Sequence, residues 1–458
     1  MSIINNALSG SLAAQVALDV ASQNVANLKT IGYTRQGALL AALGPNGNIK
    51  SPGSGVEVSS LLRFSDNYKT QQMWRAASDL GQRTLAQPYL TQLEQVMGND
   101  ASSISAGLDS FFSALNAASV DPTNSPLRQQ VINAAEGMAQ HFNSLNDVMS
   151  NQRLSVQQQR ATTVPQINGL TRDIAHLNQK IAAAKAIGAN ASSLIDARDQ
   201  GIDQLASLVG IQVIDQPDGS RNVSLRSGQP LVLSSSASTI AVQGNADGSQ
   251  TMKLTFGNET FTLDNTKLGG QLGGLGDYET NVLLPLKQAV TDIARELSNK
   301  VNVQLGAGFA LDGSPGVPLF DFNAVSTTGM LKISAGVTAD KLAFSNNGAT
   351  SGDSTNLQLL INIRTQPITI ASIGSVLIGD ADTQLVGKLG MDSKQNQSLL
   401  ATAETVRLQA EESWKSTSGV NSDEEAINLL EFQKMYQANM KVIAVANALF
   451  DSTLAMMG

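Results

Sequence analysis

The chain opens with SIINNALSGSLAAQVALDVASQNVANL at residues 2–28, a stretch whose apolar side chains recur at helical spacing and whose only charged residue is Asp19. The small and apolar positions form two adjacent rows: Ile3, Ala7, Gly10, Ala14, Ala17 and Ala21, and beside them Ile4, Leu8, Leu12, Val16 and Val20. This spacing predicts a helix that is apolar over much of its circumference. Such a helix needs partners on more than one side.

The other end of the chain has the same character. Residues 432–450 read FQKMYQANMKVIAVANALF, and from there to the end the only further charge is Asp451. One apolar stripe comprises Leu429, Phe432, Tyr436, Met440, Ile443, Ala446 and Phe450. We expect the two end helices to pair with each other and with neighbouring subunits, because a closed monomeric bundle would need only one stripe per helix. The predicted assembly interface comprises Ile4, Leu8, Leu12, Val16, Leu429, Phe432, Tyr436, Ile443 and Phe450.

Length and composition bound the class of protein. A chain of 458 residues is too long for one hydrophobic core, so about two to four domains are expected. The formal net charge of -8, with no Lys/Arg run to offset it, argues against nucleic acid as a partner. The absence of cysteine excludes disulfides and thiolate metal sites. We expect no signal peptide, because MSIINNALSG lacks a positively charged start and an unbroken apolar run. We also expect no membrane-spanning segment, because the sequence has no apolar run of about 18 residues.

Helical periodicity continues through the first half of the chain. We expect a helix over about 64–97 with a kink or break at Pro88, because proline removes a helical hydrogen bond. Another helix opens near Pro126 and its pattern continues beyond Pro165, and a shorter one holds 194–209. This much helical spacing predicts an elongated bundle or coiled coil.

At Gly210 the period changes to that of strands. Short β-branched runs occupy 211–215, 222–226, 239–242, 252–256 and 260–263, with Asp218-Gly219 and Asp247-Gly248 as hairpin turns. Beyond them we expect a helix over about 278–305, strands at 331–334 and 342–345, a long helix over about 381–415, and a last helix from Asp423.

The predicted fold class is therefore multidomain α+β, with paired N- and C-terminal helices, an elongated helical bundle built from both chain halves, and an inserted β-rich domain. The predicted domains are a terminal helical assembly domain at 1–32 plus 420–458, a bundle domain at 33–209 plus 371–419, and an inserted outer domain at 210–370. The termini meet, so the subunit suits a tube with the termini in its inner layer.

The end of the first helix carries a motif. Asn24-Val-Ala-Asn27, followed by Gly32-Tyr33-Thr34-Arg35-Gln36, resembles the signature of the bacterial flagellar axial proteins, which comprise rod, hook and hook-associated proteins. The stretch from Phe432 to Asn447 is similar to their C-terminal motif. The extension Arg35-Gln36 looks most like the hook-associated protein 1 family. Further agreement lies in 121–129, 194–199, 268–274 and 418–426.

This resemblance implies a structural subunit that polymerises at the hook tip and forms the hook–filament junction. Its implied partners are copies of itself in a helical or ring assembly, the hook protein, the next hook-associated junction protein, the flagellar export apparatus and a cytoplasmic export chaperone. Export through the flagellar channel would place it in the extracellular flagellum. A rod or hook subunit is the near alternative.

The family motif also has a local interpretation. Asn24, Asn27 and Gly32 suit the end of a helix, because Asn and Gly adopt left-handed conformations readily. Tyr33 is expected to pack against the bundle with its hydroxyl at the edge. Both this local role and a contact between subunits remain open.

No chemistry is evident elsewhere. Asp196, Arg198 and Asp199 are far more typical of solvated helix charges or a structural salt bridge than of a ligand site. The glycines at 269–274 lack a phosphate-loop pattern and favour a flexible connection. His141 and His176 belong to no paired-ligand motif. We therefore expect no catalytic residue, cofactor or metal, and no enzyme. An exported cell-wall hydrolase or an adhesive module is the alternative from another class.

Overall fold

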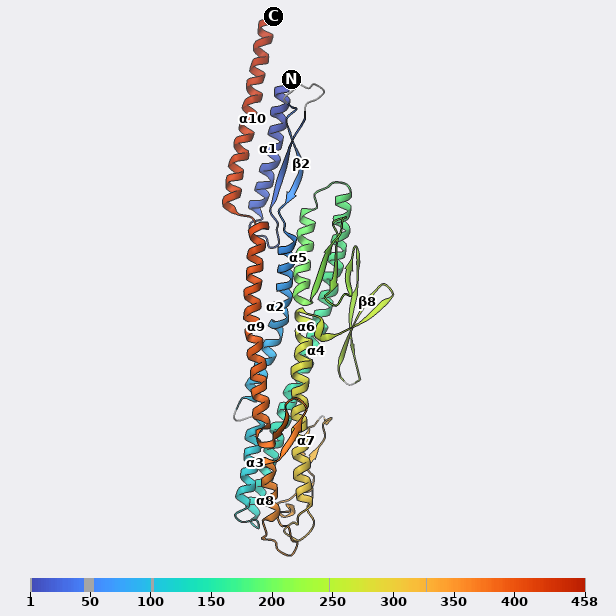
Figure 1. Cartoon of the computed structure of the whole chain (residues 1–458), viewed down its shortest axis with the longest axis vertical. Helices are drawn as coiled ribbons and strands as arrows, with labels where there is room; N and C mark the ends of the chain where they lie inside the picture. The colour runs from blue at the N-terminus through green and yellow to red at the C-terminus, as the bar shows by residue number, and fades with distance from the viewer. Residues whose placement is uncertain (1, 45–52, 100–102, 247, 327, 458) are drawn as a thin grey trace.

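The computed structural model describes residues 2–44, 53–99, 103–246, 248–326 and 328–457. Its helices form a long rod, with both termini at one end and small sheets along one side (Figure 1). The predicted combination of paired end helices, an elongated bundle and an inserted β-rich region is confirmed.

The terminal helices lie side by side and run antiparallel (Figure 1). α1 spans Ser2–Ala26 and α10 spans Ser422–Met457. A two-stranded antiparallel ribbon of β1 (Gln36–Ala42) and β2 (Val56–Arg63) packs against α1. The chain therefore leaves α1, runs back along it as a ribbon, and only then enters the bundle.

Five long helices make up most of the rod. They are α2 (Asn67–Met97), α3 (Ile104–Ala118), α4 (Ser125–Ala186), α7 (Leu284–Gly306) and α9 (Ala381–Ser418).

The helix ends follow local rules. Asn124 caps α4 by accepting from the Leu127 amide, and Pro126 stands in the first turn.

A break at Pro88 does not occur, since α2 continues through it as α4 does through Pro165. The helix α3 was not predicted, although Ile104, Leu108, Phe111 and Leu115 have helical spacing.

Two hydrophobic cores lie along the rod. The larger one joins α2, α3, α4, α7 and the start of α9, with Phe111, Phe142 and Ile293 fully buried in it. The smaller one lies nearer the terminal helices. It joins α2, α4 and α5 (Ser192–Leu208) to the sheets, around Ile167 and Val223.

The β-rich region contains a four-stranded and a three-stranded sheet. Every strand run expected between residues 211 and 263 is a strand, with ends shifted by up to two residues. The strands β5 and β6 were missed. Gly219 adopts a left-handed φ of 87° in the expected turn, whereas Asp247 of the second turn lies outside the described residues. The strands are β3 (Ile211–Asp215), β4 (Arg221–Leu225), β5 (Pro230–Leu233), β6 (Ser236–Ala237), β7 (Thr239–Gly244), β8 (Gln250–Phe256) and β9 (Glu259–Leu263).

The glycine run was misread as a flexible connection. It forms a buried helix, α6 (Gly270–Asp277), which continues through a π-helical turn (Tyr278–Leu283) into α7. A Cβ at Gly274 would lie 2.2 Å from the Gln82 carbonyl oxygen on α2. The glycines are therefore needed for close helix packing and not for flexibility.

The far end of the rod is built from short elements. The expected strand at 331–334 is confirmed as β11, which pairs with β10. The expected strand at 342–345 is wrong, because its residues form only one isolated bridge, from Ser345 to Phe309. The elements here are β10 (Phe320–Phe322), β11 (Leu331–Ile333), α8 (Thr355–Asn362), β12 (Pro367–Ile370) and β13 (Gly374–Leu377), with 3₁₀ turns at Ala339–Lys341, Ile363–Thr365 and Ile378–Asp380. A further 3₁₀ turn, Asn265–Lys267, lies between β9 and α6.

The domain boundaries remain a proposal. The predicted insertion, 210–370, contributes to both cores: its strands up to Leu263 belong to the smaller core, whereas α7 and β10 to β12 belong to the larger one.

Candidate assembly interface

Small side chains form the seam between the terminal helices. Ala7, Gly10, Ala14, Ala17 and Ala21 of one predicted row are buried, whereas Ile3, the first residue of that row, is 60% exposed. A Cβ at Gly10 would lie 2.7 Å from the amide atoms of Asn439 on α10. Small residues therefore let the two backbones approach closely, and large apolar side chains are left to point elsewhere.

The predicted interface residues divide into two groups. Six are half-buried: Ile4, Val16, Leu429, Phe432, Tyr436 and Ile443. Three are exposed: Leu8 by 48%, Leu12 by 56% and Phe450 by 61%. The structure also exposes apolar side chains that the prediction left out: Ile427, Leu430, Val445, Leu449, Leu454 and Met456. Burial of this surface against neighbouring subunits would be favourable, because it would remove apolar area from water.

Asn24 fixes the turn after α1. Its amide nitrogen donates to the Gln36 carbonyl at 2.8 Å, and its amide oxygen accepts from the Gln36 amide at 3.1 Å and from the Tyr33 hydroxyl at 2.9 Å. Gly32 has a φ of 80°, which a glycine adopts without strain. Asn27 bonds within the turn, where it accepts from the Thr30 hydroxyl. The local role of the motif is therefore present, and its role between subunits stays a prediction.

Arg35 joins the turn to the last helix. Its amide donates to the Ser418 carbonyl at the end of α9, at 2.8 Å. Its guanidinium pairs with Glu424 and with the buried Glu425 in the first turn of α10, and lies 4.7 Å from the Phe64 ring centroid. Acidic residues at a helix N-terminus are stabilised by the helix dipole as well. Arg35 thereby fixes where α9 ends and α10 begins.

A network of charged side chains lies beneath this turn. Arg63 pairs with Asp196 at 2.7 Å and with Asp199 at 3.2 Å, and the Thr34 amide donates to Asp196. Arg198 and Arg221 also pair with Asp199, and burial lowers the pKa of Arg198. Asp196, Arg198 and Asp199 on α5 therefore belong to a structural salt-bridge network. The alternative interpretation, that they are solvated helix charges, is wrong, because Arg198 is almost fully buried.

We call the region where α1, β1, α5, α9 and α10 meet the joint. The joint was missed by sequence reasoning, because nothing in the sequence indicates that Arg63 meets Asp196. Burial, and then the negative charge of Asp196, raise the pKa of the Tyr33 hydroxyl.

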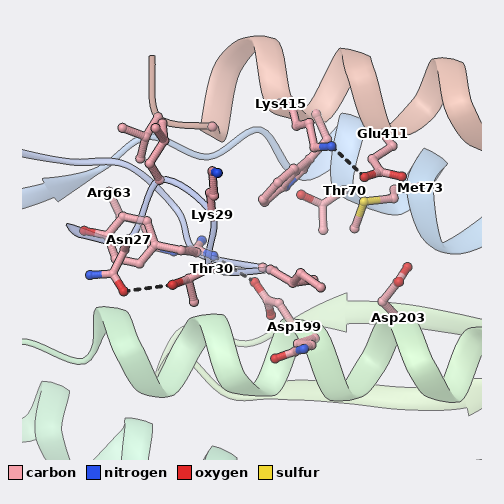
Figure 2. Close-up of a pocket in the computed structure, with 18 of the residues that line it drawn as sticks. Asn27, Lys29, Thr30, Arg63, Thr70, Met73, Asp199, Asp203, Glu411 and Lys415 are labelled. Atoms are coloured by element: carbon pink, nitrogen blue, oxygen red, sulfur yellow. Dashed lines mark hydrogen bonds and ion pairs between the residues drawn. The ribbon is translucent and has the colours of Figure 1, made fainter. Parts of the chain in front are cut away.

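A groove of about 420 Å³ opens at the joint, and we call it the joint groove (Figure 2). One wall is the turn after α1, with Leu28, Lys29 and Ile31, and the others come from α2, α5 and α9. Its charged side chains are mostly paired: Asp203 with Arg407, and Glu411 with Lys415.

Among the described residues, no group of His, Cys, Asp or Glu is arranged to hold a metal ion. No helix in the described part of the chain is long and apolar enough to cross a membrane.

Comparison with protein families gives two matches. Residues 90–320, about half of the chain, match the helical domain of the flagellar hook-associated protein FlgK. The chain belongs to the FlgK family. Residues 416–456, which hold the last helix, match the C-terminal segment of the flagellar basal body rod FlgEFG proteins. The family is one of structural flagellar proteins.

Individual relatives agree with this assignment. Flagellar hook-associated protein 1 of Escherichia coli is 27% identical over 99% of both chains, and that of Bacillus subtilis is 26% identical over 97% of this chain and 96% of its own. The FlgK hook junction protein of Burkholderia pseudomallei, a solved structure, is 27% identical with a TM-score of 0.51. That match covers 56% of this chain and 47% of the solved chain.

The alignments also bear on chain length. The alignment with the Escherichia coli protein spans 553 positions, whereas this chain has 458 residues, so that relative contains segments that this chain lacks.

Proposed function

We propose that this chain is a structural subunit of the bacterial flagellum that polymerises at the hook tip and forms the hook–filament junction. Family membership carries this proposal, and the exposed apolar side chains of α1 and α10 supply a physical means of polymerisation. Nothing favours the rod or hook alternative or the hydrolase and adhesive alternatives. We infer that the chain acts through assembly and not as an enzyme.

The proposed partners follow from the place in the flagellum. They are neighbouring copies, the hook protein on one side and the next hook-associated junction protein on the other. The export apparatus and a cytoplasmic export chaperone would deliver the chain, which would then reside in the extracellular flagellum. A chain without cysteine suits such a route, because no disulfide can form before it is threaded through a channel.

Deletion of the gene tests the function. The expected phenotype is complete hooks without filaments, with flagellin lost to the medium. Electron microscopy of sheared appendages and blotting of the medium measure both. Loss of the hook itself would overturn the proposal in favour of a rod or hook subunit.

A substitution on α1 tests the means of assembly. Leu12 is exposed, so Leu12→Asp should leave the monomer folded but prevent polymerisation. Ile443→Asp is a less clean variant, because Ile443 is half-buried in the isolated chain. Lys394→Glu on the exposed surface of α9 is the matched control for a changed charge. Wild-type motility of a Leu12→Asp strain would contradict this mechanism.

We also propose that the terminal helices gain order on assembly. Polymerisation would bury their apolar surface at about 25 cal/mol per Å², less the cost of ordering. Limited proteolysis of the monomer should therefore cut α1 and α10 before the bundle. Ends as resistant as the bundle would refute coupled ordering.

A further inference from the structure

Among the described residues, the last turns of α10 have no partner on their own chain. Gly10 of α1 faces Asn439, and the two helices are antiparallel, so the start of α1 is level with about Asn447. Beyond that point α10 continues alone, as Figure 1 shows. We call residues 448–456 the overhang. Its apolar side chains are exposed, and its one charge, Asp451, forms no ion pair among the described residues.

The joint groove has complementary features. Leu28 and Ile31 are exposed at its rim, Ile31 by 83%, and Trp414 lines its wall. Asp199, Asp203 and Glu411 are all neutralised by basic neighbours. Lys29 is different: it is exposed, lines the groove, and forms no ion pair with any carboxylate of the described residues (Figure 2). The groove thus offers apolar walls and one unneutralised cation.

We propose that the overhang of one copy docks in the joint groove of the next copy, with Asp451 against Lys29. Phe450 and Leu454 stand one helical turn apart on one face, with Asp451 beside them, so they can contact Leu28, Ile31 and Trp414 together. This inference rests on the proposed function, because it names a contact within the polymer.

The overhang cannot fill the groove of its own chain, so the contact joins two copies. The overhang begins ~40 Å along α10 from the joint, at about 1.5 Å per residue of helix. A contact that joins two different surfaces of identical chains propagates, as a ring or helical tube requires, instead of closing a two-fold dimer. Asp451 of the overhang also supplies a carboxylate for Lys29, which forms no ion pair among the described residues.

Charge reversal tests the contact in cells. Lys29→Glu and Asp451→Lys, each supplied to the deletion strain, should reduce the number of filament-bearing hooks by about tenfold or more, because like charges would then meet. The double variant restores the pairing and should recover most filaments. Lys394→Glu, also an exposed lysine without an ion pair among the described residues, is the control and should have no effect. Single variants without effect, or a double variant no better than either, would overturn the proposal.

Cysteine cross-linking tests the same contact directly, because the chain has no cysteine of its own. A Lys29→Cys/Asp451→Cys variant, assembled on hooks and treated with a mild oxidant, should give a ladder of covalent oligomers. Lys394→Cys/Asp451→Cys should give none. Absence of a ladder from assembled junctions would mean that the overhang binds another surface or another protein, and would overturn the inference.

The two proposals fail in distinguishable ways. If the unaltered chain does not restore filaments to the deletion strain, the proposed function fails. If it does restore them, but the ladder and the charge rescue are both absent, only the overhang contact is wrong.

Discussion

The bundle and the terminal helices bury their side chains to very different extents. Phe111, Phe142 and Ile293 in the bundle are completely buried, whereas Glu425 is the one buried residue among the described side chains of α10. The bundle is thus complete within one chain. The terminal pair buries mainly alanines and leaves its large apolar side chains half-buried or exposed, so we expect neighbouring chains to complete its packing.

The joint separates these two regions and is built differently from both. Its stability depends on buried charges and hydrogen bonds that define one geometry, as with Arg63 between Asp196 and Asp199. Such groups are costly to leave unpaired. A joint held in one geometry would fix the direction in which α1 and α10 extend from the bundle.

The largest expected difference between the regions concerns phenylalanine truncation. Phe142→Ala removes a fully buried ring and should lower the free energy of unfolding by about 3–5 kcal/mol. Phe450→Ala, on the exposed overhang, should change it by no more than about 0.5 kcal/mol in the monomer. Denaturant unfolding followed by circular dichroism measures both. Equal losses would show that the terminal pair is as complete as the bundle.

A smaller loss is expected at the joint. Asp196→Asn leaves Arg63 and the Thr34 amide with a weaker acceptor, and should lower the free energy of unfolding by about 1.5–3 kcal/mol. Asp109→Asn breaks an exposed pair with Arg364 and is the matched control, with a cost of about 1 kcal/mol or less. If both variants unfold at the same denaturant concentration, the joint network does not stabilise the fold.

Truncation of Asn24 should have a local effect. Asn24→Ala leaves the Gln36 amide and carbonyl without their partner and should lower the free energy of unfolding by about 1–3 kcal/mol. The turn should then open, so trypsin should cut faster after Lys29 and Arg35. Asn27→Ala removes only bonds within the turn and is the control. Equal cleavage rates in the two variants would assign Asn24 no special role.

Sequence periodicity predicted most of this fold for a physical reason. A helix or strand with one apolar face repeats at its own period, so α1, α10 and β3 could be located from spacing alone. The packing of α6 could not, because a glycine run is compatible with a loop until the opposing backbone is known. The joint was hidden for a similar reason. Arg63 and Asp196 are far apart in the chain, and their pairing depends on tertiary structure.

The smallest expected effect is a pH dependence at the joint. Burial and the charge of Asp196 raise the pKa of Tyr33 above its ordinary value of 10.0, so the folded state holds that proton more tightly than the unfolded state. The resulting stability is fully present below pH 10.0 and is lost as pH rises through the raised pKa. Unfolding midpoints of the parent chain should therefore fall more steeply above pH 10.0 than those of Tyr33→Phe. Absorbance at the tyrosinate band should show one late-titrating group fewer in that variant, and Asp196→Asn should shift the Tyr33 titration to lower pH. Parallel pH profiles for the parent and Tyr33→Phe would mean that the hydroxyl titrates as it does in the unfolded chain.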